Sequence, residues 1–154
     1  MRLVIQRTKA AQVIVDGRTT GSIPSGLVVF VGISRDDTRV EADYLLDKLL
    51  GLRIFSDENG KMNRDIAQAG GSLLLVSQFT LYGDCRKGRR PSFDFAAPPQ
   101  MAHELYDYFV ESAQNGPVPV ATGIFQADMQ VHLINDGPVT ILLDSADRQK
   151  KTAP

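Results

Sequence analysis

The sequence predicts a single α+β domain, in which mixed, barrel-like layers of β-sheet are accompanied by two main helices. Apolar segments typical of strands cluster in sets, and two segments with helical spacing, over 36–51 and 98–116, are inserted between these sets. This order favours an α+β architecture over a doubly wound one. The 154 residues, 43% hydrophobic and 23% charged, contain no internal repeat or interdomain linker, which fits one compact domain over residues 1–145.

Four strands are predicted in the first part of the chain. Residues 2–7 and 12–17 are rich in Val and Ile, as strands commonly are. Asp16-Gly17 signals a two-residue turn into residues 18–23. Residues 26–33 are continuously apolar, which predicts a strand buried on both faces.

The first helix is predicted to begin with Asp36 or Asp37 as its N-cap and to end near Gly51. The apolar residues that recur at helical spacing are Val40, Leu45, Leu46, Leu49 and Leu52. Residues 54–63 are expected to form a small hairpin about Asn59-Gly60.

A second buried strand is predicted over residues 72–82, followed by a long loop over 83–99. Pro98 and Pro99 suit the first turn of the second helix, and Gly116-Pro117 ends it. The last third, residues 120–145, is predicted to form two or three strands. Residues 146–154 are expected to be a charged, poorly ordered tail.

Composition limits the classes of function. The formal net charge of −1 means that any contact with nucleic acid must be a local basic patch. The single cysteine, Cys85, excludes an internal disulfide framework and suits a reducing cytosol. There is no signal-peptide core and no apolar run long enough to span a membrane, so a cytoplasmic protein is expected.

The usual catalytic patterns are almost absent. His103 and His132 are the only histidines, and both fit surface or structural positions better than the position of a catalytic base. Cys85 has basic neighbours, yet a lone loop cysteine is more often incidental. No spacing suggests a metal site, and neither a dinucleotide-binding motif nor a P-loop is present, so we expect no cofactor. An enzyme with this sequence would work with backbone groups and hydroxyls, or with help from its substrate.

Two stretches remain unusual. VSQFTL, residues 76–81, places polar groups at the end of an apolar strand; strand alternation would send Ser77 and Phe79 to one face and Gln78 and Thr80 to the other. NDGPVT, residues 135–140, resembles a tight turn, but a proline directly after Gly137 conflicts with the left-handed geometry of such a turn. A cis Gly137-Pro138 peptide is one resolution.

SQFTL and NDGPVT, in this order and with their flanking residues, resemble the two signature motifs of the D-aminoacyl-tRNA deacylases (D-tyrosyl-tRNA(Tyr) deacylases). The resemblance extends from the N-terminus to about Ser145. It implies a homodimer that hydrolyses the ester between a D-amino acid, or glycine, and the 3′-terminal adenosine of tRNA. It also implies that a cis Gly137-Pro138 peptide enters the partner's active site and excludes L-amino acids.

The resemblance also implies roles for individual residues. The catalytic residues at the end of the predicted strand would be Ser77, Gln78 and Phe79. Backbone N–H groups around Gln78 and Phe79 would hold the oxyanion that forms during ester hydrolysis. Thr140 is either a nucleophile, for which no base is apparent, or an orienting group. The remaining roles are motif positioning by Arg7 and Asn135, adenosine binding by Phe125 and Met129, and contact with the tRNA backbone by Arg86, Lys87, Arg89 and Arg90.

From a different class of function, the alternative is a non-catalytic tRNA- or RNA-binding module on the same fold. It would use the basic loop and Phe125 without chemistry, whereas the enzyme also needs both motifs.

Overall fold

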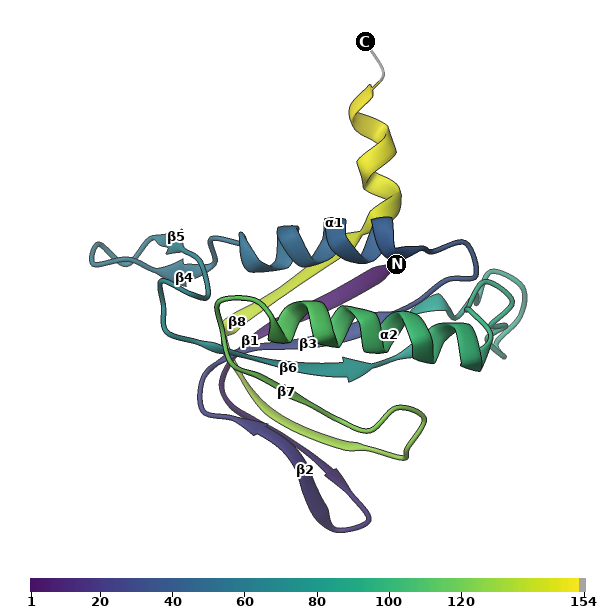
Figure 1. The fold of residues 1–154 in the computed structure, drawn as a ribbon, viewed down its shortest axis with the longest axis horizontal. Helices are drawn as coiled ribbons and strands as arrows, with labels where there is room; N and C mark the ends of the chain where they lie inside the picture. Colours follow the sequence, from purple (N-terminus) through teal and green to yellow (C-terminus); the bar gives the residue numbers. More distant parts are fainter. Residues whose placement is uncertain (153–154) are drawn as a thin grey trace.

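The computed structural model describes residues 1–152, with side chains described for residues 1–148. The elements, in chain order, are β1 (Arg2–Val15), β2 (Arg18–Ile23), β3 (Gly26–Gly32), α1 (Arg39–Leu50), β4 (Phe55–Ser56), β5 (Met62–Arg64), β6 (Ser72–Ser77), the 3-10 helix η1 (Phe79–Tyr82), α2 (Pro99–Gln114), β7 (Val120–Thr122), β8 (Gln130–Asp144) and the 3-10 helix η2 (Ser145–Thr152). The predicted α+β class with two main helices is confirmed (Figure 1).

The main sheet is mixed and strongly curved. Its strands follow the order β2-β1-β3-β6-β7, and β8 pairs with β1 in addition. β1 runs antiparallel to β2, β3 and β8, whereas β6 runs parallel to both β3 and β7. Among the described residues β8 has no second partner strand, so it forms an edge.

β1 differs from the prediction of two separate strands over 2–7 and 12–17. It is one strand of 14 residues, and its register against β8 shifts between Gln6 and Thr8 and again between Thr8 and Ala11. Such irregularities bend a strand and change the face on which its side chains lie. Leu3 therefore belongs to one core and Val13 to the other.

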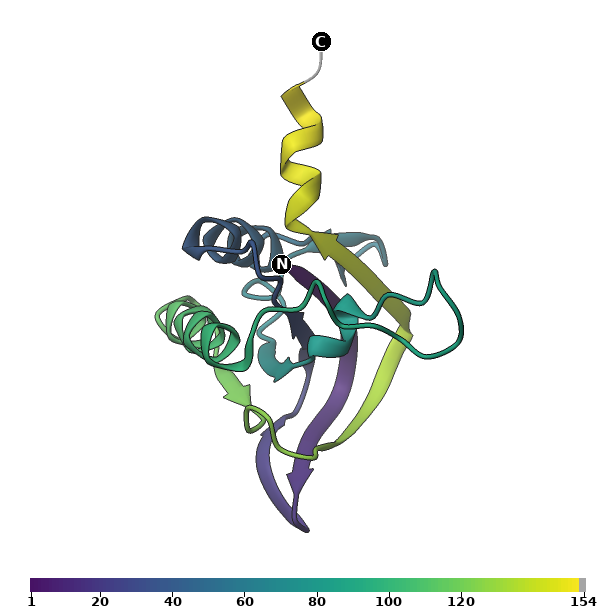
Figure 2. The ribbon, with the colours of Figure 1, turned by 90° about the vertical axis from the view of Figure 1, so that its right-hand side faces the viewer.

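Two apolar cores result from this curvature. The first lies between the sheet and the two helices, which run side by side over one face (Figure 2). The second lies on the opposite face, inside the curl of the sheet. Side chains that alternate along β3 and β6 serve both cores, as predicted for strands buried on both faces; Val29 and Leu75 face the first core, and Val28 and Leu74 face the second.

The helix caps correct one prediction. The N-cap of α1 is Thr38, which accepts a hydrogen bond from the N–H of Val40 and forms a capping box with Glu41. Asp36 and Asp37 do not cap the helix. The Asp37 carboxylate is instead buried, where it pairs with the Met1 ammonium group and accepts a hydrogen bond from the Ser34 N–H. Gly51 ends α1, and Pro99 is the first residue of α2, as predicted.

The predicted strand over 72–82 is too long. β6 ends at Ser77, and residues 79–82 form η1, so strand alternation does not apply to Gln78, Phe79 and Thr80. The Gln78 N–H still bonds to the Val31 carbonyl, in continuation of the parallel pairing of β6 with β3, and η1 then begins and packs against Gly32. A Cβ atom at Gly32 would lie 2.8 Å from Cβ of Leu81, closer than real contacts allow.

Beyond Ser145 the structure has η2, which the sequence analysis did not predict. Residues 153–154 lie outside the described residues. The expected poor order of the tail stays a prediction.

A candidate active site at the carboxyl ends of β3 and β6

A hollow of about 750 Å³ opens where the parallel strands β3 and β6 end. Val31 and Val76 line it from these strands, and Pro99 and Ala102 line it from the first turns of α2. In α/β proteins ligands commonly bind at the carboxyl ends of parallel strands, and β3 and β6 form a parallel pair here. The hollow is therefore the first candidate for a site.

The SQFT stretch forms one side of this hollow. Ser77, Gln78, Phe79 and Thr80 all line it. The Gln78 N–H is already engaged by the Val31 carbonyl, 2.8 Å away. The N–H groups of Phe79 and Thr80 begin η1, and no acceptor among the described residues bonds to either. Of the donors expected around Gln78 and Phe79, the Gln78 N–H is thus occupied and the next two are available.

Phe125 and Met129 line another side of the hollow, so the structure brings them together with SQFT. The Phe125 ring stacks on His103, with 4.4 Å between ring centroids and 7° between planes, and lies 5.7 Å from the Tyr106 ring. The Tyr106 hydroxyl donates to the Leu75 carbonyl at 3.0 Å. Two residues of α2, one of them anchored to β6, therefore hold the Phe125 ring.

Several lining residues were missed by the sequence analysis. They include Phe93, Ala96, Ala97, Pro98, Pro99, Ala102 and Gln126. Phe93 packs edge-on against Phe79, with ring centroids 4.9 Å apart. Phe93 lies three residues after Arg90 in the chain, but only the fold shows that this segment returns to the hollow.

The NDGPVT stretch lies elsewhere, within β8. The Gly137-Pro138 peptide is cis, Gly137 has φ +138°, and both residues are exposed. Neither residue lines the hollow of its own chain. One chain therefore holds its two motifs at separate places.

Arg7 and Asn135 fix the backbone on both sides of Gly137-Pro138. The Arg7 Nε donates to the Asp136 carbonyl at 3.0 Å, and its Nη1 donates to the Ile54 carbonyl at 2.6 Å. The Asn135 side chain accepts from the Val139 N–H at 2.7 Å and donates to the Val139 carbonyl at 3.3 Å. This short chain segment is held by side chains from both β1 and β8.

Thr140 is exposed on β8, outside the hollow of its own chain. Its hydroxyl accepts hydrogen bonds from the side-chain amides of Gln6 and Asn135, each at 3.2 Å. An amide N–H₂ group donates hydrogen bonds and cannot act as a base that removes the proton of a hydroxyl. These contacts suit an orienting group better than a nucleophile.

The basic residues Arg86, Lys87, Arg89 and Arg90 lie on an exposed loop, closed at its base by backbone hydrogen bonds between Asp84 and Ser92. The loop projects from the body of the molecule (Figure 2). Arg86 forms a two-bond pair with the Asp84 carboxylate, at 2.9 and 2.7 Å, and the guanidinium lowers the pKa of that carboxyl to about 2. Cys85 is exposed on the same loop and does not line the hollow.

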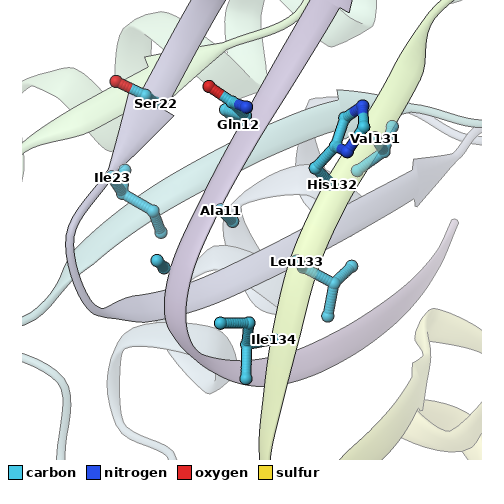
Figure 3. Close-up of a pocket in the computed structure, with 9 residues that line it drawn as sticks. Ala11, Gln12, Ser22, Ile23, Val131, His132, Leu133 and Ile134 are labelled. Atoms are coloured by element: carbon cyan, nitrogen blue, oxygen red, sulfur yellow. The ribbon is translucent and has the colours of Figure 1, made fainter.

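A second hollow, of about 720 Å³ and wide open, lies on β1, β2 and β8 (Figure 3). Gln12 and His132, which are register partners on β1 and β8, line it together with Ile23 and Ile134. It contains no residue of either motif. Over the described residues, no three His, Cys, Asp or Glu side chains gather as a metal site would require.

The sequence model of the family described as D-Tyr-tRNA(Tyr) deacylase matches residues 4–144. The chain belongs to this family. A D-aminoacyl-tRNA deacylase of Solibacter usitatus (strain Ellin6076) is 61% identical over 151 residues, covering 98% of this chain and 100% of that protein. Another, from Thermosipho africanus (strain TCF52B), is 57% identical over 145 residues, covering 94% of this chain and 97% of that protein.

A solved structure of the c-Myc DNA unwinding element binding protein is also similar to this deacylase-family chain. It has a TM-score of 0.89 and 40% identity, covering 94% of this chain and 98% of the other. These findings confirm the family resemblance seen in the sequence and the barrel-like α+β fold. Across the described residues, no helix is long and apolar enough to cross a membrane.

Proposed function

We propose that this chain, an enzyme of the deacylase family, hydrolyses the ester that joins a D-amino acid to the 3′-terminal adenosine of tRNA. The observation that carries the proposal is the hollow beside SQFT, which Phe125 and Met129 line together with Phe79 and Thr80, two residues whose backbone N–H groups bond to no described acceptor. The pocket takes the adenosine, and the N–H groups hold the ester carbonyl.

In this mechanism a water molecule attacks the ester carbonyl carbon, and the negative charge on its oxygen is held by the N–H groups of Phe79 and Thr80. Such donors are typically worth about 2.7–4 kcal/mol each. The bond to the ribose 3′-oxygen then breaks, and that oxygen takes a proton, releasing tRNA and the amino acid. An aminoacyl ester is already activated, so the neighbouring 2′-hydroxyl can help to orient and activate the water where no side-chain base is at hand.

Chirality would be set by Gly137-Pro138. An amino acid bound with its ester at the N–H groups has room for its side chain on one side only. An L side chain would run into the Gly137-Pro138 backbone, whereas a D side chain points outward, and glycine has none to exclude. Many D-amino acids, and glycine, are therefore substrates on this proposal.

The same proposal needs a homodimer. Gly137 and Pro138 are exposed and do not line their own hollow, so they reach an active site only in a second copy of the chain. The edge strand β8 also exposes two large apolar side chains, Ile134 at 60% and Leu142 at 75%. An apolar, unpaired edge of this kind favours association.

The basic loop would contact acceptor-stem phosphates, with Lys87, Arg89 and Arg90 as its available charges. Because this substrate occurs where translation takes place, we place the protein in the cytoplasm.

The first test incubates the purified protein with D-tyrosyl-tRNA, L-tyrosyl-tRNA and glycyl-tRNA and measures ester loss. We expect hydrolysis of the first and third at enzyme concentrations that leave the second intact. If glycyl-tRNA survives under conditions that hydrolyse D-tyrosyl-tRNA, steric rejection of the side chain is not the basis of the discrimination. Binding of all three without hydrolysis would favour a non-catalytic tRNA-binding module.

The second test asks whether Gly137-Pro138 acts across subunits. Phe79→Pro removes one N–H donor at the first position of a helix, where proline fits, and Phe79→Ala keeps the N–H as its matched control. Gly137→Ala alters the other motif, because its Cβ would lie 2.7 Å from Cγ2 of Val139. A mixed dimer of Phe79→Pro and Gly137→Ala chains should regain up to half of the wild-type activity, since one of its two sites carries neither change. No recovery in the mixed dimer would mean that each chain uses its own Gly137-Pro138.

A further inference from the structure

An exposed aromatic ring with two guanidinium groups over it lies outside the hollow. Phe95 is 43% exposed and belongs to neither apolar core. The guanidinium carbon of Arg35 lies 5.5 Å from the Phe95 ring centroid, and that of Arg86 lies 5.9 Å from it. We call Arg35, Phe95 and Arg86 the Phe95 cluster.

The Phe95 cluster is placed between the hollow and the basic loop. Its chain neighbours Phe93 and Ala96 line the hollow, whereas Phe95 itself does not. The Phe95 carbonyl accepts the Arg35 N–H at 3.2 Å, and Ser34 forms a β-bridge with Ala96, which fixes this segment beside the end of β3. On the other side, Arg86 belongs to the basic loop.

Aromatic rings and guanidinium planes side by side are the chemistry that binds unpaired bases. A base stacks on either surface, and positive charge attracts the phosphates that link the bases. Here Arg35 carries that charge, because Arg86 is paired with the Asp84 carboxylate and contributes mainly a stacking surface. The chain as a whole has a net charge of −1, so attraction for nucleic acid must come from local groups such as these. The Phe95 cluster adjoins the hollow where an adenosine would bind.

We propose that the Phe95 cluster is a stacking site for the single-stranded nucleotides that directly precede the terminal adenosine of the tRNA. The inference rests on the proposed function, which puts the adenosine in the hollow and the stem phosphates at the basic loop. The unpaired nucleotides must connect these two places, and the Phe95 cluster lies between them. The site recognises the 3′ end by stacking, independently of the amino acid.

The test compares three substrates that carry different lengths of the tRNA 3′ end. Hydrolysis is measured for D-tyrosyl-adenosine, for D-tyrosyl-CpA, which restores one preceding cytidine, and for D-tyrosyl-tRNA. Binding is measured with the matching amide-linked analogues, which are not hydrolysed. In the wild type, adding the cytidine should lower KM and Kd by roughly 5- to 150-fold, the effect of one stacked base.

Phe95→Ala should remove most of this gain. KM and Kd rise for D-tyrosyl-CpA and D-tyrosyl-tRNA, stay unchanged for D-tyrosyl-adenosine, and kcat is preserved throughout. Phe95→Trp keeps a stacking surface and should retain the gain. Met62→Ala, at a residue on β5 that is 55% exposed, is the control and should change none of these values.

Two results would overturn the inference while leaving the proposed function in place. One is an equal response of Phe95→Ala and wild type to the added cytidine. The other is an equal loss for D-tyrosyl-adenosine and D-tyrosyl-CpA, which would mean that Phe95 only shapes the hollow. If the wild type hydrolyses none of the D-tyrosyl esters, the proposed function fails, and this inference fails with it.

Discussion

Arg7 bonds to the carbonyl oxygen of Asp136, the residue before Gly137, with 3.0 Å between Nε and oxygen. The same guanidinium donates to the Ile54 carbonyl at 2.6 Å, and the side chain is only 12% exposed. A planar, rigid group with two carbonyl partners fixes the direction of the peptide that follows Asp136. This contact connects β1 to the segment on which the proposed handedness of the enzyme depends.

Arg7→Lys should weaken both activity and chiral discrimination. A lysine ammonium keeps the charge but lacks the planar fork, so at least one of the two bonds is lost. Since such bonds are worth about 1.5–3 kcal/mol, kcat/KM for D-tyrosyl-tRNA should fall by about 10- to 150-fold. The ratio of D- to L-tyrosyl-tRNA hydrolysis should fall as well. Arg53→Lys, where an exposed arginine also bonds to a carbonyl, is the control; a D/L ratio that Arg7→Lys leaves unchanged would contradict a positioning role.

Thr140→Ala should retain hydrolysis within about 10-fold of the wild type. The Thr140 hydroxyl is surrounded by amide donors, and removal of a true nucleophile costs about 10⁶-fold in kcat in a serine protease. A substrate with a 2′-deoxy terminal adenosine should instead lose at least about 100-fold with the wild-type enzyme, the scale of acid–base assistance. Single-turnover rates measure both effects. A million-fold loss in Thr140→Ala, with normal cleavage of the 2′-deoxy substrate, would reverse the two roles.

Asp84→Asn should strengthen tRNA binding. The Arg86 guanidinium lowers the pKa of Asp84 to about 2, so this carboxylate is charged at every pH near neutrality and occupies Arg86. Its removal frees Arg86 for a phosphate, and the slope of log K against log salt should become steeper by about 1. Asp94→Asn removes an equal charge from the same region without freeing an arginine, so it should leave the slope unchanged. If the two variants show the same slope of log K against log salt, Arg86 does not contact a phosphate even when it is free to do so.

Asp37→Asn should lower the free energy of unfolding by about 3–5 kcal/mol. Asp37 is the buried partner of the Met1 ammonium group, and the loss of one member of a buried ion pair leaves the other charge uncompensated. Urea denaturation measures the change: the urea concentration at the midpoint of unfolding should fall, while the dependence of the unfolding free energy on urea concentration stays similar. Asp36→Asn, at the exposed neighbouring residue, should be within about 0.5 kcal/mol of the wild type. Similar midpoints for the two variants would show that the pair contributes little.

The sequence predicted the elements with strong local patterns, and it failed where distant residues decide. The apolar runs of β3 and β6 require two covered faces, and that prediction is confirmed. Three polar residues in a row, Asp36, Asp37 and Thr38, all suit an N-cap. The choice of Asp37 was wrong because its carboxylate binds the Met1 ammonium group, which is distant in the chain and lies at the start of β1. No local pattern could have shown that contact.

The site was predicted in the same uneven way. SQFTL and NDGPVT were found as short motifs, and the hollow gathers Phe125 and Met129 beside the first of them. The end of β6 at Ser77 was missed because the 3-10 turn that follows it packs against Gly32, a residue distant in the sequence. Phe93 and Ala102 were missed because an isolated aromatic or alanine carries no chemical pattern until folding brings it to a cavity.

β1, β3 and β6 each contribute side chains to both apolar cores. If either core lost its packing, the same three strands would have one face exposed to water. The other core by itself could not keep the strands in register. The molecule should thus have no stable half-folded form, and slow amide exchange in these strands should report the full free energy of unfolding in a single cooperative step.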